Sequence, residues 1–293
     1  MQILINMIFK KTYIALLFIG GFMLFPISSY SEISENSLPY MKNLKREDSL
    51  DKKSSRDTNL NNLHNARTSL NFNRGWLFKL GDFKNASKTD FNDTGWESMN
   101  LPHSFSIPYF AADRFYVGYG WYRKHFKMPV SIKEKKVFLE FDGVFQVAEL
   151  FVNGKFIGIH KGGYTGFSFD ITKSLKKGDN VIAIRVNNIW DPQLAPRAGE
   201  HTFSGGIYRN VRLIITNPVH VTWYGTFVTT PQLSRSSGKV NIKTEVVNSS
   251  ERDESVTLVS SIQGKDGILV GRIESTPGNF LRVRVLHSLK IQI

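Results

Sequence analysis

The sequence predicts an all-β protein, namely a jelly-roll β-sandwich followed by a partial immunoglobulin-like β-sandwich. From residue 70 onward, short apolar and aromatic runs alternate with Gly, Asn, Asp and Pro, and helical periodicity is nearly absent. The runs commonly start about 8–12 residues apart, which favours an antiparallel sandwich over a parallel α/β sheet. With 293 residues, 41% of them hydrophobic, the chain has room for roughly two ordinary domains with buried cores.

The first 31 residues have the layout of a secretory signal peptide. Lys10 and Lys11 precede an uncharged apolar run over residues 12–25, and the small residues Ser29 and Ser31 follow. The run is shorter than the ~20 residues that a membrane-spanning helix needs, which disfavours the alternative of an uncleaved anchor. We therefore expect cleavage close to Ser31, a periplasmic or secreted mature protein, and no stable membrane span after cleavage.

Residues 32–68 are expected to be a flexible spacer. They are rich in Ser, Asn, Lys, Asp and Arg and have no repeating apolar period. Such a segment cannot offset its ordering entropy by burial.

Residues 69–217 are predicted to form the jelly roll from eight strands. Asn153-Gly154 is typical of a type I′ hairpin turn, because both residues tolerate positive φ. The run over residues 181–186 is apolar except for Arg185, which indicates a central strand. The predicted strands span residues 76–80, 121–128, 136–142, 146–152, 155–160, 166–170, 180–187 and 209–216.

Residues 218–293 begin a second set of predicted strands, at 219–228, 239–247 and 255–263. An immunoglobulin-like sandwich takes about 100 residues and seven strands, so the 76 residues from Pro218 onward predict a truncated domain. Residues 268–293 show no clear rhythm of turns and strands that would complete it.

Composition and charge exclude several functions. The absence of cysteine removes disulfides, thiol nucleophiles and zinc sites with sulfur ligands. The seven His residues lack metal-ligand spacing, so we expect no metal and no cofactor. The net charge of +13 is spread along the chain without a basic stripe, so nucleic acid is not expected as a partner, and a nucleic-acid binder stays the weakest alternative.

Several motifs together resemble the N-terminal half of glycoside hydrolase family 2, which contains β-galactosidases, β-glucuronidases and β-mannosidases. Their order and spacing match between about residues 70 and 216. The motifs are Asn73-Arg74-Gly75-Trp76, Leu101-Pro102-His103, Gly120-Trp121-Tyr122-Arg123-Lys124, Val152-Asn153-Gly154, Gly162-Gly163-Tyr164-Thr165-Gly166-Phe167, Asp170-Ile171-Thr172 and Gly205-Gly206-Ile207-Tyr208-Arg209. The resemblance implies a jelly-roll sugar-binding domain followed by an immunoglobulin-like domain, and a β-linked saccharide as the partner.

The resemblance also implies that the catalytic residues are absent from this chain. The family carries its chemistry on a third domain, a (β/α)₈ barrel of about 250 residues, to which this chain would dock. The family's acid/base Glu follows an Asn, and this sequence contains no Asn-Glu pair. Of Glu140, Asp142 and Glu149, we interpret Glu140 as an outward-facing strand residue and Asp142 as a turn former. We predict no catalytic residue, and no hydrolysis by this chain alone.

The loop over residues 190–204 holds the candidate sugar-binding residues Trp190, Arg197, Glu200 and His201. Trp can stack on a pyranose ring, and the other three can hydrogen-bond to hydroxyl groups. The family resemblance implies that this loop reaches the rim of the active site. In the alternative interpretation, Arg197 pairs with Glu200, His201 packs under Trp190, and the loop only braces the domain.

The remaining polar and aromatic residues have structural interpretations. His103 is expected to hydrogen-bond in a turn, and Arg209 to pair with a carboxylate. Trp76, Trp96 and Trp121 are expected in the core. Two functions stay open: the non-catalytic portion of a β-galactosidase-like glycoside hydrolase, or a free-standing secreted carbohydrate-binding module or lectin.

Overall fold

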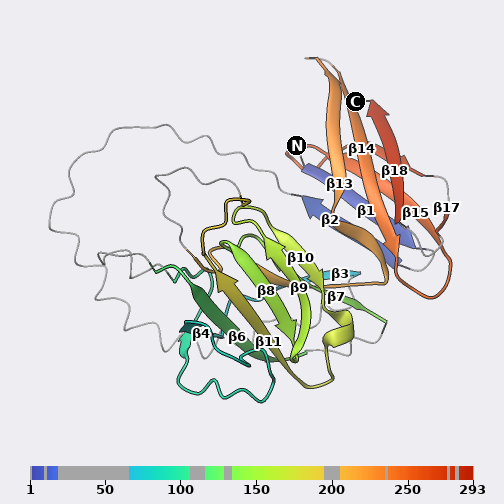
Figure 1. The fold of residues 1–293 in the computed structure, drawn as a ribbon. Coiled ribbons are helices and arrows are strands. Elements are labelled where there is room, and N and C mark those ends of the chain that lie inside the picture. Colours follow the sequence, from blue (N-terminus) through green and yellow to red (C-terminus); the bar gives the residue numbers. More distant parts are fainter. Residues whose placement is uncertain are drawn as a thin grey trace, which may run out of the picture.

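The computed structural model consists of two β-sandwiches, and the second lies against one sheet of the first (Figure 1). It describes residues 2–9, 12–18, 66–105, 116–128, 134–194, 205–234, 237–275, 278–280 and 284–292. Only the backbone is described within residues 2–18 and 278–292. The helical content of the described residues is one 3-10 turn, Thr172–Ser174, so the predicted all-β fold class is confirmed. None of the described helical segments has the length or apolarity to cross a membrane.

The first sandwich is built from a six-stranded and a four-stranded antiparallel sheet. The six-stranded sheet has the order β5-β4-β6-β11-β8-β9. Its strands are β4 (Trp76–Leu80), β5 (Glu97–Met99), β6 (Tyr119–Lys127), β8 (Val147–Val152), β9 (Lys155–Lys161) and β11 (Asp179–Asn187). The four-stranded sheet has the order β10-β7-β12-β3. Its strands are β3 (Arg67–Asn71), β7 (Lys136–Phe141), β10 (Phe167–Asp170) and β12 (Val211–Thr216).

The apolar residues between the two sheets form the main core. Trp76, Tyr122 and Ile182 from one sheet and Leu139 from the other are all fully buried. Trp96 and Trp121 are also buried, under the loop that crosses the outer face of the six-stranded sheet. The prediction that Trp76, Trp96 and Trp121 are core residues is confirmed.

The hairpin between β8 and β9 has the predicted turn. Asn153 has φ +52° and Gly154 has φ +81°, as a type I′ turn requires. Asn153 also holds the neighbouring strand: its Oδ1 accepts a hydrogen bond from Val181 N at 2.9 Å, and its Nδ2 donates to Ser174 O at 2.7 Å. β11 lies between β6 and β8, so the predicted central strand is also confirmed.

The second sandwich has a three-stranded sheet β13-β14-β18 and a sheet β16-β15-β1-β2, in which β17 also pairs with β15. Its buried core includes Val221, Ile242, Val246, Leu258 and Ile262. The strands are β13 (Val219–Leu233), β14 (Gly238–Asn248), β15 (Glu254–Gln263), β16 (Leu269–Glu274), β17 (Gly278–Phe280) and β18 (Arg284–Gln292).

Seven strands were not predicted from the sequence, and five of them lie after residue 66. β3 begins at Arg67, within the expected spacer, and β5 has only three residues. Residues 268–293, for which the sequence shows no clear rhythm of turns and strands, contain β16, β17 and β18, which pair with β15 and β14. β3 and β18 pair with β12 and β14, which are distant in the sequence, so a short or irregular apolar pattern suffices to form them.

The remaining strands, β1 (Gln2–Phe9) and β2 (Thr12–Phe18), lie in the segment for which the sequence predicts a signal peptide. β1 pairs along the edge of β15, from Gln2 opposite Gln263 to Phe9 opposite Val256. The signal peptide concerns processing of the chain and stays a prediction. Cleavage near Ser31 would remove both strands and leave that edge of β15 without this partner.

Candidate functional site

Six segments of the jelly roll meet where the loop over residues 190–204 begins and ends. They are residues 101–105, 116–119, 143–146, 162–164, 187–190 and 205–208, and we call this region the loop end. The first four residues of the Gly205-Gly206-Ile207-Tyr208-Arg209 motif lie here, together with Gly162-Gly163-Tyr164. Loops on a rigid sandwich are where binding residues concentrate, so the loop end is the candidate site.

Backbone hydrogen bonds join the segments of the loop end. Phe105 N donates to Gly205 O at 2.9 Å, and His103 N donates to Ile207 O at 2.9 Å. Phe145 and Gly206 form an isolated β-bridge, with N to O distances of 2.9 and 3.0 Å. Phe105, which directly precedes residues 106–115, and Gly205, which directly follows residues 195–204, are therefore held next to one another.

Glycine is required at two positions of the loop end. A Cβ on Gly205 would overlap the buried ring of Phe105. Gly206 has φ +130°, and a Cβ there would lie 2.6 Å from His103 O and 2.8 Å from the Tyr122 hydroxyl. The Gly-Gly pair therefore lets the chain pass directly over the segment that contains His103.

His103 is held as a neutral side chain under the loop end. Burial lowers the pKa of His103 to about 4 and raises the pKa of Tyr122 far above its usual range. The Tyr122 hydroxyl accepts a hydrogen bond from Ile207 N at 3.4 Å, and its oxygen forms a second hydrogen bond with His103 Nδ1 at 2.8 Å. His103 thus hydrogen-bonds as expected, but to the core tyrosine. Its role is to support the Gly206-Ile207 segment.

Of the candidate sugar-binding residues, the structure describes Trp190. Its side chain is 63% exposed. Val117 and Ile189 are also exposed. Asn188 N donates to Gly118 O at 3.3 Å, and this hydrogen bond brings the segment of Val117 next to that of Ile189 and Trp190. Arg197, Glu200 and His201 lie outside the described residues. The exposed apolar surface around Trp190 suits stacking on a sugar ring, and the described part of the loop end holds no pair of acids for hydrolysis.

Glu140 faces away from the jelly-roll core, as interpreted from the sequence, but it is not exposed to solvent. Glu140 is only 7% exposed, and its carboxylate lies 3.4 Å from Arg67 Nη2 and 3.9 Å from Arg212 Nε. Asp142 is held by Arg212, through Nη1 at 2.9 Å and Nη2 at 2.5 Å. Within the described residues no carboxylate pairs with Arg209, so the expected ion pair is made by Arg212 instead.

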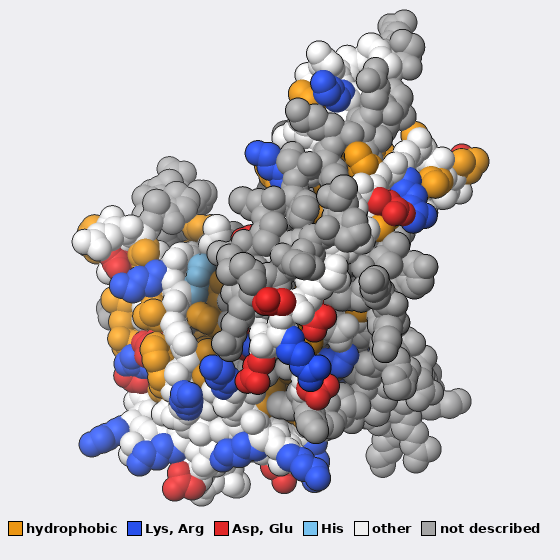
Figure 2. Space-filling model, turned by 90° about the vertical axis from the view of Figure 1, so that its right-hand side faces the viewer, with side chains coloured by type: hydrophobic (Ala, Val, Ile, Leu, Met, Phe, Trp, Pro, Cys, Tyr) orange, Lys and Arg blue, Asp and Glu red, His pale blue; other side chains and the backbone are white. Residues whose placement is uncertain are grey.

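Glu149 is likewise committed to an ion pair. Arg185 Nη1 donates to Glu149 Oε1 at 2.9 Å, while its Nε and Nη2 donate to Asp82 at 2.9 and 2.5 Å. The hydrogen bond from Arg185 holds the pKa of Asp82 below its usual range, against the opposing effect of burial. The three acids of the central strands that the sequence singled out are therefore all paired with arginine. On the face shown in Figure 2, acidic and basic side chains also lie interspersed.

Comparison with known proteins identifies the jelly roll. Residues 85–218 match the family described as glycosyl hydrolases family 2, sugar binding domain. This segment belongs to glycosyl hydrolase family 2. The chain is 35% identical over 235 residues to a β-glucuronidase of Formosa agariphila, an alignment that covers 70% of this chain and 23% of that protein. A β-galactosidase of Bacteroides ovatus is 37% identical over 221 residues, with 72% of this chain and 25% of that protein covered.

Solved family 2 structures have the same fold. The β-glucuronidase of Bacteroides uniformis superposes with a TM-score of 0.72 at 31% identity, and the match covers 78% of this chain and 27% of that one. A putative β-galactosidase from Bacteroides fragilis gives a TM-score of 0.71 at 31% identity, covering 78% and 36%. The chain thus spans about a quarter of the length of the curated relatives it matches, and it corresponds to an N-terminal, non-catalytic portion.

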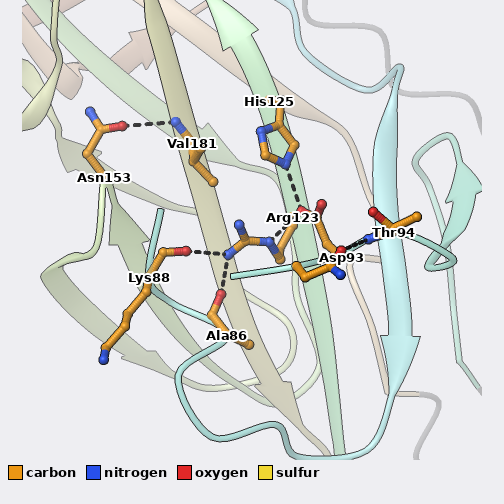
Figure 3. Close-up of polar contacts among 9 residues, drawn as sticks. Ala86, Lys88, Asp93, Thr94, Arg123, His125, Asn153 and Val181 are labelled. Atoms are coloured by element: carbon orange, nitrogen blue, oxygen red, sulfur yellow. Dashed lines mark hydrogen bonds and ion pairs between the residues drawn. The ribbon is translucent and has the colours of Figure 1, made fainter. Parts of the chain in front are cut away.

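The family 2 jelly roll is braced by a buried ion cluster on β6 (Figure 3). Arg123 is fully buried, and its Nε donates to Asp93 Oδ2 at 2.7 Å. Its Nη1 donates to the carbonyl oxygens of Ala86 and Lys88, and His125 Nε2 lies 2.7 Å from Asp93 Oδ2. Burial favours the neutral form of Asp93, but the hydrogen bonds from Arg123 and His125 outweigh it and lower the pKa of Asp93. The cluster fixes the loop over residues 81–96 onto the sheet.

The described residues contain no group of three or more His, Asp or Glu side chains that could hold a metal ion. The sequence approach found the loop end through its motifs, but it missed the partners of Glu140. Those partners come from β3 and β12, and only the register of the four-stranded sheet brings them together.

Proposed function

We propose that this chain is the sugar-binding, non-catalytic part of an exported β-glycosidase that acts on β-galactosides or β-glucuronides. The single observation that carries the proposal is the loop end, where a family 2 jelly roll fixes the ends of two loops beside the exposed Trp190. In this proposal Trp190, Arg197, Glu200 and His201 contact the sugar, while the acid/base and nucleophile belong to a (β/α)₈ barrel to which this chain docks.

The printed names of the relatives support both substrate classes. They include β-glucuronidases and β-galactosidases at 34–37% identity. The described residues of the loop end include no cation that would pair with the carboxylate of a glucuronide, so they favour neither class.

The first experiment is an assay of the purified chain with chromogenic β-galactoside, β-glucuronide and β-mannoside. We expect no turnover above background, because Glu140, Asp142 and Glu149 are all paired with arginine. A retaining hydrolase needs one free nucleophile and one proton donor about 5–5.5 Å apart. Turnover that survives replacement of these three acids would place the chemistry elsewhere in the chain.

The second experiment supplies the barrel in trans. A barrel from a family 2 relative, expressed with this chain, should gain activity on one of the three substrates, and Trp190→Ala should reduce that gain. The control variant Phe156→Ala removes another exposed aromatic side chain, on β9 away from the loop end. An equal effect of both variants would show that the loop end does not reach the substrate.

A free-standing carbohydrate-binding module is the alternative function, favoured by the exposed aromatic surface at Trp190. Such a module would bind a saccharide without any barrel. The nucleotide sequence downstream distinguishes the two: a barrel with an Asn-Glu pair in any frame supports the glycosidase, and its absence supports the module.

A further inference from the structure

The outer face of the four-stranded sheet carries a row of polar side chains. Ser168 of β10, Glu140 of β7 and Arg212 of β12 lie directly opposite one another in the sheet register. Leu139 and Phe141, the neighbours of Glu140 on its strand, point into the jelly-roll core. Because side chains alternate along a strand, the row faces away from that core.

The second sandwich covers this row. Arg67 Nη1 donates to Val221 O at 3.1 Å, and the ring of His220 packs on Phe138 with the centroids 5.4 Å apart. Between the sandwiches the structure leaves a pocket of 340 Å³ and an adjacent one of 200 Å³. Both are lined by Arg67, Glu140, Val221, Thr222 and Trp223, and we call them together the interdomain groove.

A β-bulge places an aromatic side chain over the groove. The register of β13 on β14 shifts between Val221 and Thr226, and Tyr224 within the shift has φ +48°. This left-handed conformation is costly for a side chain other than glycine. Trp223 remains 38% exposed although it lines both pockets, and its ring contacts Tyr224 in a T-shaped arrangement at 4.4 Å. The strained turn therefore places the indole of Trp223 at the groove, together with the polar side chains of Ser168, Glu140 and Arg67, which we call the floor of the groove.

The polar groups of the floor are incompletely satisfied. Ser168 Oγ is buried and has no hydrogen-bond partner among the described residues. Among the described residues, Glu140 has two long contacts, to Arg67 and Arg212, and burial raises its pKa against the pull of both arginines. A buried hydroxyl without a partner costs free energy, so a ligand that hydrogen-bonds to it gains affinity.

We propose that the interdomain groove binds one neutral pyranose unit of a saccharide, stacked on Trp223 and hydrogen-bonded to Ser168, Glu140 and Arg67. A sugar presents an apolar ring face and a set of hydroxyl donors and acceptors, which matches an indole opposite a serine, a carboxylate and a guanidinium. The ligand is neutral because the charges that line the groove balance: Arg67 and Arg212 are matched by Glu140 and Asp170.

This inference does not rest on hydrolysis or on the loop end. The five tryptophans allow the two sites to be observed separately, since Trp76, Trp96 and Trp121 are buried. In a Trp190→Phe chain, Trp223 is the exposed tryptophan that reports on the groove. In a Trp223→Phe chain, Trp190 reports on the loop end.

The experiment titrates both chains with lactose, cellobiose and xylobiose while tryptophan fluorescence is recorded, up to roughly 50 mM, so that millimolar Kd values are covered. We expect a saturable change in the Trp190→Phe chain with at least one of these sugars. Calorimetric titration of the chain without tryptophan substitutions should then give a Kd for the sugar. We expect Ser168→Ala to raise this Kd roughly fivefold and Trp223→Ala to raise it more than tenfold.

The control variants keep the result interpretable. Ser69→Ala removes an exposed hydroxyl from the same sheet outside both pockets and should leave the Kd unchanged. Circular dichroism and the midpoint of thermal unfolding establish that each variant is folded. The inference is overturned if no sugar changes the fluorescence of the Trp190→Phe chain, or if folded Ser168→Ala and Trp223→Ala chains bind as tightly as the parent. A saturable response in the Trp223→Phe chain alone would support the loop end and refute the groove.

Discussion

Phe105 and Gly205 are joined by a hydrogen bond from N to O of 2.9 Å, although they are far apart in the sequence. One begins and the other ends a loop of the candidate site. The ring of Phe105 also fills the space into which a side chain at position 205 would project. This single contact fixes position 105 against position 205.

Gly205→Ala should therefore destabilise the jelly roll and disturb both loops. The added methyl group meets a fully packed ring, and overpacking of this kind typically costs about 1–3 kcal/mol. Urea unfolding measures the cost. In a Phe105→Ala background the same substitution should cost much less, because the ring is gone; an equal cost in both backgrounds would show that the clash is not with Phe105.

Arg123→Leu should be among the most destabilising single substitutions. It leaves Asp93 partly buried without its arginine, and breaking a buried ion pair costs about 3–5 kcal/mol. Lys127→Ala is a matched control on the same strand, since Lys127 pairs with Asp179 but both side chains are exposed. We expect a clear loss in urea midpoint for the first variant and none for the second. Similar midpoints would mean that the cluster in Figure 3 does not brace the loop.

Asn153→Ala should cost more stability than Asn153→Gly. Both substitutions remove the hydrogen bonds to Val181 and Ser174, but only alanine is strained at φ +52°. We expect a difference of about 1 kcal/mol between the two variants in chemical unfolding. Equal stability would indicate that the turn changes its conformation when the amide is lost.

The stability of the protein should fall as the pH is lowered from about 6.5 to about 4. Burial, with the positive charges of Arg67 and Lys136, lowers the pKa of His220 to about 4, against hydrogen bonds to the carbonyl oxygens of Asn217 and Pro218. As the pH falls, His220 of the unfolded chain binds a proton before His220 of the folded protein does. The contribution of His220 to the free energy of unfolding is therefore complete above the pKa of the unfolded state, and it is lost as the pH falls through the pKa of the folded state. His103 has the same direction of shift.

Urea midpoints measured between pH 7 and 4 check this dependence. His220→Gln should flatten it, because glutamine does not titrate, while lowering stability at pH 7 through lost packing on Phe138. An unchanged slope in this variant would show that folding does not lower the pKa of His220.

The mature chain should begin close to residue 32 when the gene is expressed in a bacterium with a periplasm. Mass spectrometry of the exported protein gives its N-terminus, and Leu16→Arg should block export by placing a charge in the apolar run. A purified chain that retains Met1 would contradict the predicted processing.

Local signals predicted most of the jelly roll. Asn153-Gly154 specifies its turn through φ alone, and the apolar run of β11 predicts a strand buried on both faces. Glu140 shows the limit of such reasoning: strand alternation correctly directs it away from the jelly-roll core, but no local pattern indicates that a second sandwich covers that face. The sequence alone did not predict β5 or β18, whose strand character shows only in their pairing with β4 and β14. Of the predicted sugar-binding residues, the structure describes Trp190.

The pairing of β1 with β15 has a consequence for the predicted processing of the chain. If the chain is cleaved near Ser31, the edge of β15 from Val256 to Gln263 loses the eight residues of β1 that pair with it. An unprotected strand edge of this kind readily recruits another chain. Solubility of the processed protein would then depend on what takes over that row of donors and acceptors.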